Sequence, residues 1–230
     1  MADRPYTLLS CSVSIDGYLD GGTEKRLLLS NDADLDRVDA VRATCDAILV
    51  GAATVRKDNP RLLVRAPQRR DKRVACGLQP SPIKVTVTGC GQLDTCAKFF
   101  TAGDTEKLVY CASPAVVETR ERLGSVATVV DGGEPVDMRR LSEDLYVRGV
   151  QRLMVEGGGM MHTQFLTADL ADELQLVVAP FFVGDSGARR FVSDGRFPWH
   201  PERRAMLAEV RRIEDVVLLR YALSARFRLD

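Results

Sequence analysis

The sequence has little that could hold a structural metal ion or cross-link a small fold. Its 230 residues include six cysteines and two histidines, and no two cysteines form a CxxC pair. The zinc deaminase signature, H-x-E with P-C-x-x-C, is absent as well. A chain of this length can bury roughly 70% of its unfolded surface, so it needs neither disulfides nor a metal to fold. We therefore expect free, buried thiols in place of disulfides, no metal site and no deaminase domain.

The sequence also lacks an excess of charge and any long apolar run. The 32 Lys+Arg residues balance 32 Asp+Glu residues, which gives a formal net charge of zero. Nucleic acids and acidic membranes attract positively charged proteins, so this balance promotes neither partner. No segment approaches the ~20 apolar residues of a membrane span, and no secretory signal is visible at the start. We expect a soluble, cytoplasmic protein.

Apolar, strand-length segments alternate with helical patterns along the chain. Strands are expected at residues 7–13, 47–50, 83–88, 107–111, 126–130, 153–155 and 173–180, and helices at 32–45, 113–123, 138–148 and 160–166. Ser30 or Asn31 can cap the first helix, whose apolar positions recur at helical spacing. Residues 206–222 suit a closing hairpin, although a helix is an alternative. This order predicts one α/β domain over residues 1–230, with a mostly parallel sheet and an antiparallel C-terminal hairpin.

The stretch from Arg56 to Pro82 is polar, basic and rich in proline. We interpret it as a long loop, a kind of segment that is commonly functional or disordered. Its basic residues are Arg65, Arg69, Arg70, Lys72 and Arg73.

A run of three glycines directly follows the strand expected at residues 153–155. In Glu156-Gly157-Gly158-Gly159-Met160-Met161, small residues let the backbone approach a ligand, and backbone N–H groups face it at a helix N-terminus. This arrangement suits a pyrophosphate, although the run is not the G-x-G-x-x-G dinucleotide fingerprint. The alternative is a tight strand–helix turn that binds nothing.

A second candidate segment, Val50 to Pro60, also follows a strand. Gly51 and the two alanines after it permit close approach of a ligand, Thr54 offers a hydroxyl, and Asp58 could accept a bond from a ribose or order a water. Asp58 could equally cap the Asn59-Pro60 turn. Ligands of α/β sheets gather where strand ends converge, so the two segments support each other.

Together these segments resemble the reductase domain of riboflavin biosynthesis, the RibD C-terminal type, whose fold is similar to that of dihydrofolate reductase. The resembling pieces are Ser14–Gly17, Val41–Ala43, Asp46–Gly51, Thr54-Val55, Asp58–Leu62, Arg65 and Glu156–Gly159. The resemblance implies a three-layer α/β/α domain and an NADPH-dependent reduction. A hydride would open the ribose at C1′ and convert a phosphorylated ribosylamino-pyrimidine to the ribitylamino-pyrimidine. A homodimer is also implied, with the C-terminal strands and Phe181-Phe182 as contributors.

The resemblance also carries over site residues. On the cofactor side they are Ser12, Gly51, Thr54, Asp58, Gly89, Gly157, Gly158, Gly159, Met160 and Met161, and on the substrate side Arg26, Arg42, Leu62, Arg65 and Glu156. Guanidinium groups suit a 5′-phosphate, although surface ion pairing is their ordinary role. Asp58 and Glu156 are the catalytic candidates: Asp58 would help deliver a proton, and Glu156 would accept bonds from the pyrimidine or ribose. Capping of the next helix is the plain alternative for Glu156.

The sequence leaves the substrate open between the aminated and the deaminated pyrimidine ribotide. A paralogous NADPH-dependent reductase of a pterin, dihydrofolate or a specialised nucleoside metabolite is the alternative function. A non-catalytic nucleotide sensor on the same fold is a third possibility. The basic residues after Arg65 are one candidate for holding the 2′-phosphate of NADPH, and a mobile solvated loop is the other interpretation.

Overall fold

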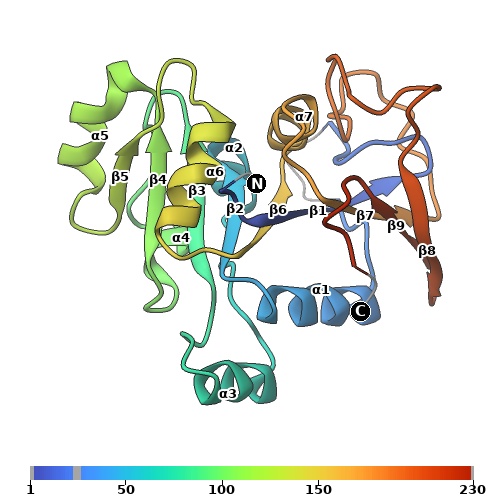
Figure 1. Ribbon diagram of the computed structural model, residues 1–230, viewed down its shortest axis with the longest axis horizontal. Coiled ribbons are helices and arrows are strands. Elements are labelled where there is room, and N and C mark those ends of the chain that lie inside the picture. Colours follow the sequence, from blue (N-terminus) through green and yellow to red (C-terminus); the bar gives the residue numbers. More distant parts are fainter. Residues whose placement is uncertain (1–2, 23–26, 229–230) are drawn as a thin grey trace. The chain divides into compact units, whose positions relative to one another are not determined.

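The computed structural model describes residues 3–22 and 27–228 (Figure 1). The chain divides into two compact units: unit 1 comprises Met1–Pro5 and Val38–Met154, and unit 2 comprises Tyr6–Arg37 and Val155–Asp230. Helix α1 (Asp32–Ala43) and strand β6 (Arg152–Gly157) each pass from one unit into the other. In the part of the chain that the structure describes, no helix is long and apolar enough to cross a membrane.

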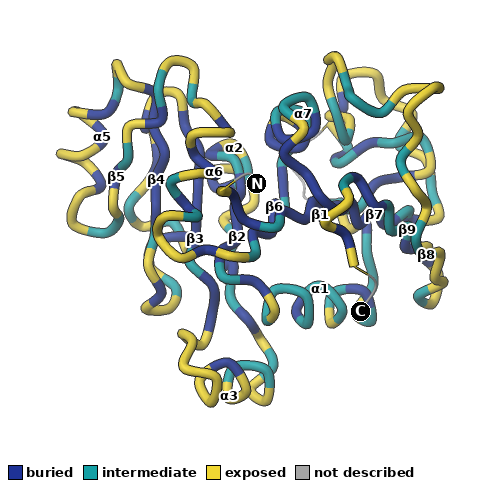
Figure 2. Tube along the Cα trace, in the orientation of Figure 1, coloured by how far each residue is buried: buried dark blue, intermediate teal, exposed yellow. Residues whose placement is uncertain are grey.

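Unit 1 contains a run of parallel strands in the order β5-β4-β3-β2. Their bounds are β2 (Ala47–Gly51), β3 (Ile83–Thr88), β4 (Lys107–Cys111) and β5 (Thr128–Asp131). The helices are α2 (Ala52–Asp58), α3 (Pro67–Ala75), α4 (Lys98–Thr101), the 3-10 turn η1 (Ser113–Ala115), α5 (Val116–Leu123) and α6 (Met138–Val147). Strands β2, β3 and β4 are buried along nearly their whole length (Figure 2), which explains their unbroken apolar character.

Unit 2 contains strands in the order β1-β7-β9-β8. Strand β1 (Tyr6–Ser14) pairs in parallel with β7 (Glu173–Ala179), with Leu9 opposite Leu174. Strands β8 (Met206–Ile213) and β9 (Val216–Ala222) form an antiparallel hairpin that joins β7 through β9. Helix α7 (Gly159–Thr167) follows β6. The predicted α/β fold with mostly parallel strands and an antiparallel C-terminal hairpin is therefore confirmed.

The expectation of a long loop over residues 56–82 is wrong. Helix α2 extends to Asp58, and α3 begins at Pro67, whose fixed φ suits the first helical position. The residue that α3 buries is Arg73, which donates to the carbonyl oxygens of Gln79, Ala43 and Cys45. No apolar period marks this helix, because a guanidinium bonded to three carbonyls takes the place of an apolar anchor. The short helix α4 was likewise not expected.

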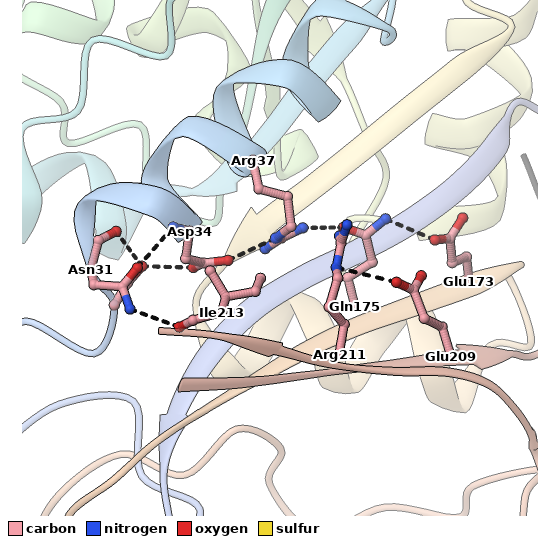
Figure 3. Close-up of polar contacts among 9 residues, drawn as sticks. Asn31, Asp34, Arg37, Glu173, Gln175, Glu209, Arg211 and Ile213 are labelled. Carbon is pink, nitrogen blue, oxygen red and sulfur yellow. Dashed lines mark hydrogen bonds and ion pairs between the residues drawn. The ribbon is translucent and has the colours of Figure 1, made fainter. Parts of the chain in front are cut away.

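Polar contacts fasten the first turns of α1 to the C-terminal strands of unit 2 (Figure 3). Asn31 caps α1: its side-chain oxygen accepts the Asp34 N–H at 2.9 Å, and its amide donates to the Ile213 carbonyl at 2.9 Å. Asp34 is fully buried and accepts a bond from Arg37 Nε at 2.7 Å, and Arg37 donates onward to the Gln175 side chain at 2.5 Å. The fully buried residues of α1 are thus carboxylates, while its apolar side chains are half-buried.

The same network continues across the hairpin. Arg220 donates to Glu173 at 2.9 Å and to Glu209 at 3.0 Å, while Gln175 donates to Glu173 at 2.8 Å. Glu173 is 1% exposed, and its charge is compensated by these donors, as a buried carboxylate requires. The six cysteines are free thiols, as predicted, but only Cys11, Cys45 and Cys111 are buried. The prediction of burial is wrong for the other three, which are exposed.

Candidate functional site

In unit 1 the predicted cofactor glycines lie at the carboxyl ends of two adjacent strands. Gly51 ends β2 and pairs with Val87 of β3, and Gly89 follows the last residue of β3. A Cβ built on Gly89 would meet no atom within 4 Å, so the space beside this residue is open. The parallel pairing therefore brings two of the predicted residues to one sheet edge, as expected for a ligand site in an α/β fold.

Helix α2 starts directly after Gly51 and carries two further predicted residues. Thr54 is half-buried in its first turn, and Asp58 is exposed as its last residue. The backbone N–H of Asn59 bonds to Val55 O, so the helix ends without help from the Asp58 carboxylate. Asn59 adopts a left-handed conformation with φ 43°, which asparagine tolerates well, and its side-chain oxygen accepts the Lys98 N–H at 2.6 Å.

Three of the predicted substrate residues come together beside the end of α1. Arg42 donates from Nη1 to the Leu63 carbonyl at 3.3 Å, next to Leu62, which is 2% exposed and holds a left-handed φ of 50°. Arg65 lies further along the same segment with its side chain 56% exposed. A buried non-glycine residue with positive φ is strained, and such strain tends to occur at functional sites.

The basic residues of α3 are largely engaged by the protein itself. Arg69 Nη1 lies 2.8 Å from Asp39, Arg70 donates to the Arg65 carbonyl at 2.9 Å, and Arg73 is buried. The interpretation of this stretch as a mobile solvated loop is therefore wrong. Asp39, a buried carboxylate of α1, was not among the predicted site residues, because no motif marks it.

In unit 2 the three glycines at the end of β6 and the start of α7 have different structural roles. Gly157 has φ 151°, a conformation that L side chains rarely adopt, and Gly158 is the N-cap of α7. A Cβ on Gly159 would stand 2.6 Å from the Arg190 carbonyl oxygen. Gly159 is therefore required by the packing of the segment around Arg190, a role that sequence reasoning did not anticipate for it.

The segment after Arg190 stays in contact with α7. Ser193 N–H donates to Thr163 Oγ1 at 2.9 Å, and that hydroxyl donates to the Gly159 carbonyl at 2.7 Å. The ring of Phe191 lies with its centroid 5.7 Å from that of His162, which is fully buried. Burial disfavours the charged imidazole and lowers the pKa of His162 to about 4.

The turn after β1 is hydrogen-bonded to the start of the segment that connects β7 to β8. Asp16 accepts bonds from the Ser14 hydroxyl at 2.5 Å and from the N–H groups of Val183 and Gly184 at 3.1 and 2.8 Å. Desolvation is the largest single influence and by itself would raise the pKa of Asp16, but these hydrogen bonds together outweigh it and lower that pKa to about 2. The Ser14–Gly17 motif thus has a structural role of its own.

The remaining predicted site residues that the structure describes lie on β1, β6 and α7. Ser12 is half-buried in β1 opposite Val177, and Glu156 is half-buried as the next-to-last residue of β6. Met160 is 66% exposed in the first turn of α7, whereas Met161 is buried. Arg26 lies outside the described residues.

A family model and the curated relatives of this chain indicate the same protein family. A family model described as the RibD C-terminal domain matches residues 5–219. The 2,5-diamino-6-ribosylamino-4(3H)-pyrimidinone 5′-phosphate reductase of Archaeoglobus fulgidus is 36% identical over 182 residues, which cover 79% of this chain and 83% of the relative. The protein of the same name from Methanothermobacter thermautotrophicus is 34% identical over 194 residues, covering 82% and 84%.

A solved structure agrees in fold. The RibD of Acinetobacter baumannii, in its form 2, superimposes with a TM-score of 0.78 at 22% sequence identity, and the match covers 96% of this chain. This chain spans only 58% of that longer protein, so the likeness concerns the fold of one part of it. With the family model matching nearly the whole sequence, the chain belongs to the RibD C-terminal domain family.

Proposed function

We propose that the chain is a single-domain reductase that converts 2,5-diamino-6-ribosylamino-4(3H)-pyrimidinone 5′-phosphate to its ribitylamino product in riboflavin biosynthesis. The observation that carries this proposal is the match to relatives of that name over more than four-fifths of their own length. Their name specifies the aminated pyrimidine, which favours reduction before deamination.

The reaction balances with one hydride and one proton. NADPH, when bound, supplies the hydride, which adds to C1′ of the open-chain imine of the ribosylamine. The proton goes to the imine nitrogen, so the C1′=N double bond becomes a single bond and the ribose becomes a ribityl chain. Because the cofactor would carry the redox chemistry, the residues of the chain have to bind the substrate and the cofactor, orient them and exclude water.

The residues present fit a nicotinamide dinucleotide. At the start of α7 the N–H groups of Met161 and His162 bond to the Gly158 carbonyl, so the two preceding N–H groups, of Gly159 and Met160, are the ones that suit a pyrophosphate. Gly157, with its positive φ, sets the path of the chain into this helix start. Gly89, which has open space beside it, and Thr54 would contact the cofactor in unit 1.

Arg42 and Arg65 would hold the 5′-phosphate, because guanidinium groups bind phosphate through paired, charge-assisted hydrogen bonds. Leu62 offers a buried apolar contact beside them. Glu156 would accept bonds from the amino groups of the pyrimidine or from ribose hydroxyls. Asp58, exposed at the end of α2, would deliver the proton directly or through a water.

The experiment that tests this function measures NADPH oxidation with the aminated and the deaminated ribotide offered separately. We expect turnover of the aminated ribotide. Turnover of the deaminated one alone would reverse the proposed order, and NADPH binding without turnover of either would favour the paralogous reductase. Arg65→Ala should raise KM for the ribotide roughly ten- to hundredfold with little change in cofactor affinity. Equal losses of both would mark Arg65 as structural.

We further infer a cytoplasmic homodimer. Strand β8 ends the strand order of unit 2 and exposes Met206, Leu207 and Val210 at 58, 50 and 60%. An exposed apolar edge strand is a common site of pairing between chains. Light scattering at micromolar concentration is the measurement, and a monodisperse monomer would remove the proposal.

A further inference from the structure

The carboxylate of Asp39 is buried on α1 and surrounded by donors from the segment that carries Arg65. Oδ1 accepts the Arg65 backbone N–H at 2.5 Å. Oδ2 accepts the Ala66 N–H at 3.1 Å and a bond from Arg69 Nη1 at 2.8 Å. Arg65 Nε lies 3.6 Å from Oδ1, and Asp39 itself is 1% exposed. Both oxygens of one carboxylate are therefore occupied in holding two consecutive residues.

The charges around Asp39 favour its ionised form. Burial by itself would raise the pKa of the Asp39 carboxyl, but the bonds from Arg65 N–H, the Arg69 guanidinium and Ala66 N–H outweigh it and hold that pKa below its usual range. Arg42 stands one turn further along α1, and Arg70 bonds to the same segment. Two guanidinium groups, those of Arg65 and Arg69, thus lie within ion-pair distance of the one Asp39 carboxylate.

The main chain of Arg65 is held on both sides. Its N–H is bonded to Asp39, and its carbonyl oxygen accepts a bond from Arg70 Nη1 at 2.9 Å. Its side chain has Nε 3.6 Å from Asp39 Oδ1 and is 56% exposed. Such an arrangement fixes where a guanidinium originates and leaves its end accessible to a ligand, as preorganised binding groups require.

We propose that Asp39 is a positioning residue that fixes the Arg65 main chain and thereby aims the Arg65 guanidinium at the substrate phosphate. This assignment rests on the proposed function, because it takes Arg65 as a phosphate ligand. It adds a residue that touches neither substrate nor cofactor and acts through Arg65.

The test compares Asp39→Ala and Asp39→Asn with the wild type, on the phosphorylated substrate and on its dephosphorylated nucleoside. Asp39→Ala should raise KM for the phosphorylated substrate about tenfold, on the scale of one lost charge-assisted bond. Its kcat, its NADPH affinity and its KM for the nucleoside should stay within about twofold. Asp39→Asn, which keeps an acceptor oxygen for the backbone, should have a smaller effect and serves where the alanine variant does not fold. Asp71→Asn, the same change on an exposed residue of α3, is the matched control and should change nothing.

A double-mutant cycle separates positioning from mere structural support. If Asp39 acts through Arg65, then Asp39→Ala combined with Arg65→Ala should bind the phosphorylated substrate no more weakly than Arg65→Ala alone. Additive losses, or equal losses on the nucleoside, would overturn the assignment. If the wild type turns over neither ribotide, the proposed function fails by itself. The dissociation constant of inorganic phosphate then tests Asp39, and an unchanged value in Asp39→Ala would overturn its role.

Discussion

His162 should make the protein sensitive to mild acid. Its ring is fully buried in α7, and neither ring nitrogen has a hydrogen-bond partner among the residues that the structure describes. Burial lowers the pKa of His162 from its ordinary 6.5 to about 4. The buried imidazole is neutral at pH 7, and it takes up a proton readily only when the chain unfolds and exposes the ring to water.

The magnitude follows from the difference between the two pKa values. Between pH 6.5 and 4 the unfolded chain binds a proton at this histidine that the folded chain does not, so the free energy of unfolding falls as the pH falls. The lost stability is about 2 kcal/mol at pH 5 and approaches about 3 kcal/mol below pH 4. Losses of this size are a large fraction of the 5–15 kcal/mol that stabilises an ordinary domain.

Urea unfolding at pH 7.5 and pH 5 measures this effect. The wild type should lose about 2 kcal/mol more than His162→Leu between these two pH values, because leucine has no proton to take up. His200→Gln, a change at the exposed second histidine, is the matched control and should follow the wild type. Parallel pH profiles for the wild type and His162→Leu would refute the reasoning, whatever the baseline stability of the variant.

Three further changes test other parts of the structure. Gly159→Ala brings a Cβ to 2.6 Å from the Arg190 carbonyl oxygen. We expect this variant to lower the free energy of unfolding by about 1–3 kcal/mol and to weaken NADPH binding in a fluorescence titration. An unchanged variant would contradict the packing role of Gly159. Burial lowers the pKa of Lys84 to about 8, so between pH 8 and about 10.4 the folded chain binds fewer protons at this residue than the unfolded chain does. The free energy of unfolding of the wild type should therefore rise with pH over that range relative to Lys84→Met. Equal slopes of the two proteins in urea unfolding would show that the lysine has an ordinary pKa. Asp58→Asn should lower kcat about 10²–10⁴-fold if Asp58 delivers the proton, and an unchanged kcat would remove that role.

The strands and the closing hairpin were predictable because their signal is local. Buried parallel strands show as unbroken apolar runs, and β2 and β4 do so plainly. Helix α3 was not predicted because the side chain that anchors it is Arg73, a residue type that is normally exposed, and two of its three carbonyl partners, Ala43 and Cys45, are 30 and 28 residues away.

The candidate site was predictable only in part. Ordered motifs indicate Arg42, Leu62 and Arg65, but nothing in the sequence pairs Asp39 with backbone N–H groups about 26 residues away. Gly159 shows the opposite difficulty: a glycine beside two others was interpreted as ligand space, whereas the Arg190 carbonyl occupies that space. Contacts between distant segments decide both cases, and no local pattern encodes them.

The pairing of β1 with β7 has a consequence for how the chain folds during synthesis. Thr7 and Asp172, which are hydrogen-bonded beside this pair, are 165 residues apart. At about 5–20 residues per second a ribosome needs roughly 10 to 30 s to make the intervening chain. Residues 38–154 of unit 1 lie inside that interval, so they can fold while the apolar residues of β1 still have no β7 partner. We expect β1 to be the segment of the nascent chain that most needs protection from aggregation, and unit 2 to be completed only after translation has passed Ala222.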